Sequence, residues 1–544
     1  VAAVADLKIT RPSRREVGLM NESAVNATPE TASGTQQFRS QVGHISRQSG
    51  VFFAGTVFTA SLGYLFKVYL ARVLGPEDLG LFALGVTLIG FIGIFNTLGL
   101  AQSAVRFVAS YQAADKFKEL HALLWRGGGL LLAANVVLAV VLLTFGRFVA
   151  VHFYHSPRLV KYLPLFAGLM LFNVLSSFYG KVLAGYRDVK LRTLIINFLG
   201  SPLQMLLTVL LISAGLGLSG YLIAQIITAI VGFVLLLIVV RKFTPPAARF
   251  SALPGSYPER QVWSFSAAMI ALTVAEFFMS QVDRVALGFY RNAREVGIYS
   301  IASAVVVYVP LVLSSINQIF APTIADLHTR GEHALLARLF QSLTKWVLAL
   351  TLPLALVIIV FARPLMRIFG PAFEPGWPIL VIGTLGQLLN CGVGSVGYLL
   401  LMSGHQRQLM KVQISMSIVM VLVSAGLVPV WGLVGAALAA ALTNAGSNVW
   451  NLMEVRKALG ISPYNRGYLQ LLPPTLTVLA LMLVFKKYSY ILHYDWAAVA
   501  IALGAAYGVF AAILLNIGLD DDDRLIVTAI WSRVRGAFPN AGGA

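Results

Sequence analysis

Long apolar runs separated by short polar connections dominate this chain of 544 residues. A helix that crosses about 30 Å of hydrocarbon needs roughly 20 apolar residues. With Gly, Pro and charged residues taken as boundaries, the pattern predicts fourteen transmembrane helices, and the fold class is an all-α polytopic membrane protein. The predicted helices cover residues 48–72, 79–105, 122–146, 160–184, 191–213, 218–240, 262–288, 296–322, 336–362, 377–402, 408–430, 432–453, 469–486 and 495–516.

The two ends of the chain and the connections lack such runs. Residues 1–45 contain Pro, Ser, Thr, Asn and Gln but no apolar stretch long enough for a signal-peptide core, which is typical of disordered segments. We expect a disordered cytoplasmic tail over 1–45 and a second cytoplasmic tail over 517–544. The longest predicted connection runs from about 241 to 261, so we expect no extramembrane catalytic domain.

Composition and charge agree with a membrane protein. Hydrophobic residues make up 58% of the chain and charged residues 12%, against about 25% charged residues in soluble domains. The net charge of +19 is scattered between apolar runs, whereas a nucleic-acid surface would gather it in patches. The single cysteine, Cys391, excludes an intrachain disulfide.

The basic residues also predict an orientation. With the N-terminus inside, 26 of the 41 Lys and Arg residues fall in or beside predicted cytoplasmic segments, 10 fall in or beside segments on the opposite side, and the other five lie further inside the helices. Lys and Arg are enriched in cytoplasmic loops. We therefore predict that both termini are cytoplasmic.

An internal repeat relates two parts of the chain. A shift of 217 positions superposes Ser49 on Ser266, Thr56 on Thr273, Lys67 on Arg284, and the run 79–82 on 296–299. Each repeat holds six predicted helices, an even number, so both copies enter the membrane in the same direction and an axis along the membrane normal relates them. We predict an N-terminal lobe over 46–242, a C-terminal lobe over 260–457, two additional helices within 468–516, and a substrate cavity between the lobes.

Two cations take equivalent positions in the repeats. Ionisable side chains within a bilayer are costly and usually face a bundle interior or an aqueous cavity. In one interpretation Lys67 and Arg284 hold an anionic head group such as a diphosphate, Arg284 through a bidentate fork and Lys67 as a point charge. In the other, both side chains extend to the membrane interface, and Asp283 is a structural partner of Arg284. Lys345 and Lys181 are further candidates for the cationic cavity.

Polar residues form a stripe on each of the same two helices. Helical spacing places Ser266, Thr273, Glu276, Ser280 and Asp283 on one face of the seventh predicted helix, and Ser49 and Thr56 on the matching face of the first. We expect these stripes to line the cavity. Glu276 is a candidate for coupling transport to a proton or sodium ion, or else for a hydrogen bond to a neighbouring helix. No phosphate-binding loop, metal-ligand cluster or nucleophile motif appears in the sequence, so we assign no catalytic residue, metal or cofactor.

Several segments resemble a known family. They are residues 69–80 (YLARVLGPEDLG), 98–106 (LGLAQSAVR), 322–327 (PTIADL) and 296–299 (VGIY), together with Asp283-Arg284. These resemble the polysaccharide-biosynthesis flippases, including the O-antigen flippases, of the multidrug/oligosaccharidyl-lipid/polysaccharide exporter superfamily. The likeness spans about residues 46–516.

The resemblance implies a V-shaped pair of six-helix lobes in the bacterial inner membrane. It implies a cationic cavity for the diphosphate of a polyprenyl-diphosphate-linked oligosaccharide, and two extra helices that guide the lipid tail. The implied partners are that substrate, membrane lipids, and a polysaccharide polymerase and glycosyltransferases of the same pathway.

Other functions make different demands on the sequence. A drug or cation antiporter of the same superfamily favours acidic or apolar cavity residues, whereas cations outnumber acids within these helices. A membrane-embedded glycan polymerase or ligase needs a large outer loop with catalytic Arg or His groups, and the predicted outer loops are short. A structural scaffold has no need of matched intramembrane charges.

Overall fold

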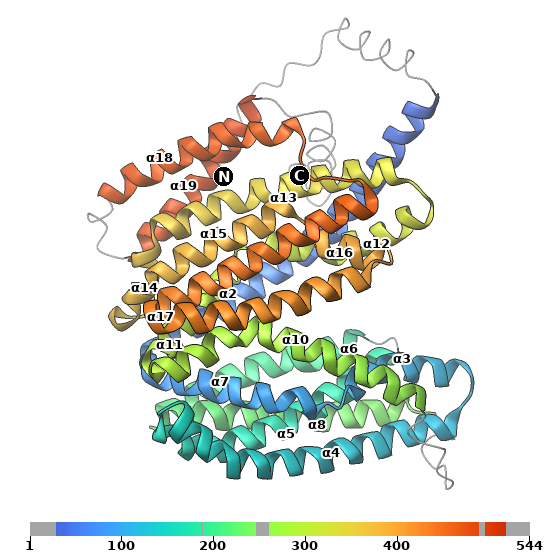
Figure 1. Cartoon of the computed structure of the whole chain (residues 1–544), viewed down its shortest axis with the longest axis vertical. Helices are drawn as coiled ribbons and strands as arrows, with labels where there is room; N and C mark the ends of the chain where they lie inside the picture. Colours follow the sequence, from blue (N-terminus) through green and yellow to red (C-terminus); the bar gives the residue numbers. More distant parts are fainter. Residues whose placement is uncertain (1–28, 187–188, 246–259, 489–494, 518–544) are drawn as a thin grey trace, which may run out of the picture.

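The computed structural model describes residues 29–186, 189–245, 260–488 and 495–517, and every regular element within these ranges is a helix (Figure 1). The prediction of an all-α polytopic membrane protein is confirmed. The first half contains α2 (Pro29–Asn96), α3 (Leu100–Ala113), α4 (Phe117–Phe148), η1 (Val149–Phe153), η2 (Pro157–Tyr162), α5 (Leu163–Gly185), α6 (Val189–Thr193), η3 (Leu194–Gly200), α7 (Ser201–Ser213) and α8 (Gly217–Phe243). The second half contains α10 (Arg260–Tyr290), α11 (Ala293–Val306), α12 (Leu311–Thr329), α13 (His333–Val360), α14 (Ala362–Ile368), η4 (Pro371–Gly376), α15 (Trp377–Val393), α16 (Val396–Met402), α17 (Gln406–Leu459), η5 (Arg466–Leu471), α18 (Leu472–Tyr488) and α19 (Asp495–Ile517).

Many of these helices are long and apolar enough to cross a membrane. Ten of them meet that criterion within the described ranges, and the pair α11 and α12, bent by 54°, makes eleven when counted as one broken span. Two of the ten are interrupted at a glycine with positive φ, Gly75 in α2 and Gly432 in α17, a conformation that glycine adopts readily. Helix α17 contains two of the predicted spans, and α2 contains the first span and most of the second, which ran to residue 105. The protein is therefore multi-pass, and the number fourteen stays a prediction.

Helix α2 begins earlier than the sequence pattern suggested. It starts at Pro29, inside the segment predicted to be a disordered tail up to residue 45. Proline suits the first turn of a helix, and the composition of the segment did not reveal this start. Residues 1–28 and 518–544 lie outside the described residues.

The helices gather into two groups (Figure 1). Helix α5 packs against α3, α4 and α8 in one group, and α15 packs against α13 and α17 in the other. Between the groups, α2 makes its most extensive contacts with α11 and also touches α10. The predicted lobe boundaries stay a prediction, while these contacts locate the seam between the groups at α2, α10 and α11.

The last two helices pack on the outside of the second group. Buried residues of α18 and α19, among them Met482 and Phe510, form an apolar cluster with Leu356 and Val357 of α13 and with Phe361. The seam between the two groups is therefore formed without α18 and α19.

Candidate functional site

A cavity of about 310 Å³ lies at the seam between α2 and α11. Lys67 of α2 and Arg284 of α10 both line it, although 217 residues separate them in the chain. Their positive charges repel each other across this space. The structure thus brings the two repeat-related cations to one cavity.

The guanidinium of Arg284 is anchored by its own helix. Its Nη1 donates hydrogen bonds to the carbonyl oxygen of Ser280 at 3.0 Å and to Oε1 of Gln281 at 3.1 Å. Guanidinium presents five N–H donors, so these two contacts orient the group and leave donors for a ligand. Gln281 also lines the cavity.

The ammonium of Lys67 lies near an aromatic ring. Its Nζ is 5.8 Å from the centre of the Tyr308 ring, within the range of a cation–π contact. Lys67 itself is half-buried. Its ammonium is therefore held in the seam, and the placement differs from the alternative in which the side chain reaches out to the lipid headgroups.

Asp283 does not line this cavity. It is buried, and its Oδ2 accepts a 2.6 Å hydrogen bond from the Tyr299 hydroxyl of α11. Its Oδ1 accepts a bond from the backbone N–H of Arg284. The carboxylate thus joins α10 to α11, and the side chain of Arg284 is bonded elsewhere.

At one end of the cavity, α2 and α11 cross with their backbones in direct contact. A Cβ atom placed on Gly80 would overlap the carbonyl oxygen of Ala293, and one placed on Gly297 would overlap that of Pro76. Gly80 and Gly297 are 217 positions apart, and so are Pro76 and Ala293. The two contacts are therefore the same contact made twice under the internal repeat.

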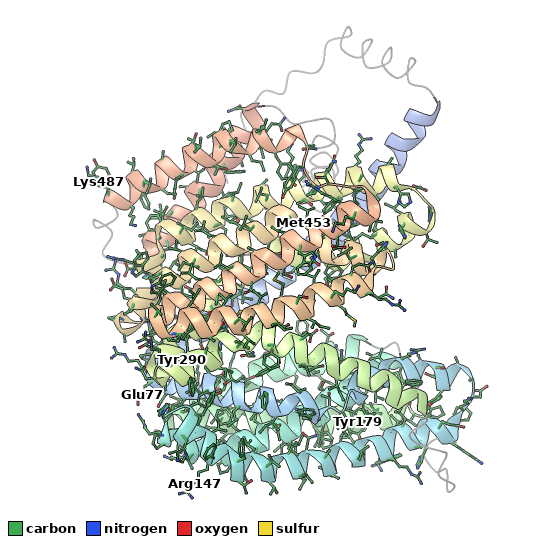
Figure 2. All side chains as sticks on the ribbon, in the orientation of Figure 1. Glu77, Arg147, Tyr179, Tyr290, Met453 and Lys487 are labelled. Atoms are coloured by element: carbon green, nitrogen blue, oxygen red, sulfur yellow. The ribbon has the colours of Figure 1, made fainter. Side chains whose placement is uncertain are left out.

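Further contacts close the same end, which we call the outer end because the orientation predicted from the basic residues places it outside the cytoplasm. Arg72 of α2 donates from Nε to the carbonyl oxygen of Ile368 at 2.8 Å. Phe153 of η1 and Phe289 of α10 have ring centres 4.6 Å apart. Each of these pairs joins one half of the chain to the other. Figure 2 shows Glu77 and Tyr290 together at this end of the molecule and Tyr179 away from it.

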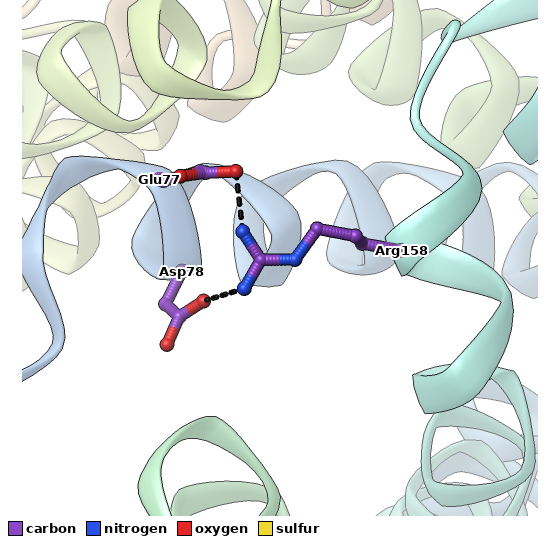
Figure 3. Close-up of polar contacts among 3 residues, drawn as sticks. All are labelled: Glu77, Asp78 and Arg158. Carbon is purple, nitrogen blue, oxygen red and sulfur yellow. Dashed lines mark hydrogen bonds and ion pairs between the residues drawn. The ribbon is translucent and has the colours of Figure 1, made fainter.

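An ion pair supports the corner at which α2 enters the crossing. Arg158 of η2 donates to Glu77 at 2.5 Å and lies 3.7 Å from Asp78 (Figure 3). The Arg158 and Glu77 side chains are 61% and 57% exposed, so solvent screens this pair. It is an orienting contact more than a source of stability.

The other predicted cations lie elsewhere. Lys345 of α13 is buried, and its Nζ donates to Oε1 of Gln470 at 2.8 Å, which ties α13 to η5. Lys181 is half-buried near the end of α5. The start of α5 follows η2, whose Arg158 contacts Glu77 at the outer end, so Lys181 lies at the opposite end of this helix. Neither lysine is among the residues that line the cavity of Lys67 and Arg284.

The predicted polar stripes are described only in part. Glu276 and Ser280 of α10 are exposed, and Thr273 is half-buried. None of the three lines the cavity at Lys67. The side chains of Ser49, Thr56 and Ser266 lie outside the described residues, so their lining role stays a prediction.

Three polar cavity residues were missed by the sequence reasoning. They are Tyr221 of α8, Gln281 of α10 and Ser300 of α11. Gln281 precedes Arg284 by three residues, roughly one helical turn, and this spacing was a usable signal. Ser300 Oγ is buried and has no hydrogen-bond partner in the described part of the chain.

Comparison with known proteins places this geometry in context. The sequence profile of the family described as "Polysaccharide biosynthesis protein" matches residues 45–328. The succinoglycan biosynthesis transport protein ExoT of Rhizobium meliloti is 24% identical over 358 residues, which cover 63% of this chain and 66% of that protein. The chain thus matches slightly less than two thirds of that relative's length.

Two groups of solved structures share the fold. The structure titled "Lipid II flippase MurJ, inward closed conformation" superposes with a TM-score of 0.66 and 14% identity over 86% of this chain and 99% of that one. An inward-facing multidrug resistance MATE family transporter of the MOP superfamily gives a TM-score of 0.61 and 16% identity, covering 73% and 94% of the two chains. At these identities the likeness concerns the fold alone.

Proposed function

Because this chain belongs to the polysaccharide biosynthesis protein family, we propose that it is a transporter that flips a polyprenyl-diphosphate-linked oligosaccharide from the cytoplasmic to the outer leaflet by alternating access. The same proposal includes a bacterial inner-membrane location with both termini in the cytoplasm. It also includes the two six-helix lobes, 46–242 and 260–457, as the moving parts. Glycosyltransferases and a polymerase are the proposed partners in the pathway.

One observation supports the proposal above the others. Lys67 and Arg284, one from each repeat, line a single cavity. Two cations held together repel each other, and an anion between them relieves that repulsion. A diphosphate offers several oxygen acceptors to the free donors of Arg284 and to the ammonium of Lys67.

The proposed task also fits the physics of the bilayer. A bare diphosphate in hydrocarbon loses its hydration at a large cost, and a polar cationic cavity offsets that cost while the prenyl tail stays in lipid. Helices α18 and α19 would present apolar surface to that tail. An inside-negative potential favours outward movement of negative charge by about 2.3 kcal/mol per charge per 100 mV.

The experiment removes one cavity cation. We expect Arg284→Ala to abolish surface polysaccharide, because the head group loses a charged hydrogen-bond donor, while the protein still folds and inserts. The matched control is Arg147→Ala, which removes the same charge from the exposed end of α4 (Figure 2) and should leave polymer output unchanged. Polymer is measured at the cell surface and protein in the isolated membrane. Normal output from a well-expressed Arg284→Ala strain would overturn the assignment of this cavity.

A drug or cation antiporter shares the fold, but the cavity argues against it. A positively charged substrate would meet Lys67 and Arg284 without a facing carboxylate, since Asp283 is bonded to Tyr299 and Glu276 lies outside the lining. A polymerase or ligase role would require catalytic groups for which the cavity lining offers no candidate set.

A further inference from the structure

A second pocket lies far from the crossing of α2 and α11. It occupies about 220 Å³ between the start of α4, the end of α5 and the end of α8. The predicted orientation places this end of the helices at the cytoplasmic leaflet. Leu124, Leu237 and Val240 form its apolar walls, and its polar groups come from the side chains of Trp125, Tyr179, Arg241 and Thr244.

The charged group of this pocket is Arg241, in the last turn of α8. Its guanidinium carbon lies 5.2 Å from the centre of the Trp125 ring. Within the described residues Arg241 has no carboxylate partner and no hydrogen bond. A cation–π contact of this kind occupies none of the guanidinium N–H groups in a hydrogen bond to an oxygen acceptor, so these donors stay free. The pocket thus holds the Arg241 guanidinium in a fixed position, with N–H donors that can bind an oxygen acceptor of a ligand.

The two hydroxyl groups beside Arg241, those of Thr244 and Tyr179, differ in whether they already form hydrogen bonds. Thr244 Oγ1 donates to the carbonyl oxygen of Val240 at 2.7 Å and lies 3.2 Å from the Tyr186 hydroxyl, so it is already engaged. The Tyr179 hydroxyl packs against Gly128, where an added Cβ would lie 2.6 Å from it. In the described part of the chain no hydrogen bond satisfies that hydroxyl. Tyr179 therefore adds a second unused donor beside Arg241.

The surroundings favour a ligand that is part of the membrane. Trp125 is 39% exposed, and Trp and Tyr concentrate at the headgroup level of bilayers. Basic pockets between helices on the cytoplasmic side suit anionic lipid head groups. The volume lies below the roughly 300–1,000 Å³ typical of pockets for whole drug-sized ligands, so it suits a phosphate with its first attached atoms and excludes an oligosaccharide.

We propose that this pocket binds the phosphate of an anionic phospholipid of the cytoplasmic leaflet, through Arg241 and Tyr179, with the glyceride carbons against Leu124, Leu237 and Val240. The bound lipid joins the ends of α4, α5 and α8. This site is separate from the cavity at Lys67 and Arg284. Binding here is independent of the proposed transport.

The test measures lipid binding by the purified full chain, without any polysaccharide precursor. The protein is reconstituted in phosphatidylcholine nanodiscs, and its melting temperature is followed as phosphatidylglycerol replaces phosphatidylcholine. We expect a rise for the unmodified protein. For Arg241→Gln we expect the apparent affinity for phosphatidylglycerol to fall roughly 10-fold or more, as for the loss of a hydrogen bond to a charged group.

Matched variants make the result specific. Arg407→Gln removes one exposed charge near the start of α17, on the same predicted side of the membrane, and should bind phosphatidylglycerol as the unmodified protein does. Tyr179→Phe removes only a hydroxyl and should weaken binding several-fold, which keeps the test decisive if Arg241→Gln does not fold. The proposal would be overturned if the melting temperature stayed the same as phosphatidylglycerol replaced phosphatidylcholine. It would also be overturned if inorganic phosphate at the same concentration raised the melting temperature equally. Unchanged binding in both Arg241→Gln and Tyr179→Phe would overturn it as well.

Discussion

Substituting alanine for a glycine at the crossing of α2 and α11 should prevent closure of the outer end. A Cβ on Gly297 would overlap the Pro76 carbonyl oxygen and lie 2.8 Å from the backbone nitrogen of Gly80, where real Cβ atoms keep at least 3.0 Å. The obstacle is backbone, which no rotamer change can move aside. The helices would have to separate by about 1 Å or more, which forfeits much of the dispersion energy across the contact.

The size of the effect follows from overpacking. An extra methyl group in a tight contact costs roughly 1–3 kcal/mol, and the whole cost falls on the outer-closed conformation. That conformation should then be disfavoured by a factor of roughly 5 to 150. We expect the cavity to become reachable from outside in Gly297→Ala.

The assay reads this accessibility with a thiol reagent that does not cross the membrane. The chain's one cysteine, Cys391, is buried, so the background is low. A Gln281→Cys probe in the cavity should label slowly from outside the cell in the otherwise unchanged protein and faster when Gly297→Ala is added. The control is Gly232→Ala in α8, where an added Cβ meets nothing within 4 Å. If labelling stayed slow in Gly297→Ala, the crossing could not be the contact that closes this end.

Three further substitutions test the roles of individual cations in stability and transport. Lys345→Met should lower the melting temperature, because it removes the buried hydrogen bond to Gln470, worth about 1.5–3 kcal/mol for a charged donor. Lys67→Met should leave the melting temperature near normal and reduce surface polysaccharide. The opposite pattern would reverse our assignment of the two lysines. Arg158→Gln should change the free energy of unfolding by less than about 1 kcal/mol, since Arg158 and its nearer partner Glu77 are both exposed. A large loss of stability in low-salt thermal unfolding would contradict that value.

The fold was predictable from the sequence because bilayer thickness demands a long apolar run for every crossing. Pairing Lys67 with Arg284 also needed no structure, since the shift of 217 positions aligns them. That shift compares two helices with each other and so requires no knowledge of which face points inward. Residues without such a counterpart were harder to place.

Lys345 and Asp283 show why. The sequence gives the depth of Lys345 in its helix, but the direction of the side chain depends on η5, which supplies Gln470 from 125 residues away. Asp283 and Arg284 are adjacent, so their side chains point about 100° apart on a helix. A helix face that presents Arg284 to the cavity therefore need not present Asp283 to it as well. Tyr299, which binds Asp283, lies on a different helix, and only the packing of α10 on α11 brings them together.

The internal repeat has a stronger consequence at the crossing than at the cations. Because Gly80 meets Ala293 and Gly297 meets Pro76, the repeat exchanges the two contacts, and neither can open alone without tilting α2 against α11. We therefore expect Gly80→Ala to raise outside labelling of the Gln281→Cys probe as much as Gly297→Ala does.

The crossing is also connected to the cation cavity. Leu79, next to Gly80, and Ser300, about one helical turn after Gly297, line the cavity together with Lys67 and Arg284. Separation of the helices would therefore also draw the two cations apart and weaken their joint hold on an anion as the outer end opens. Unequal labelling by the two glycine variants would show that the halves do not move as equivalents, and this coupling of opening to release would then fail.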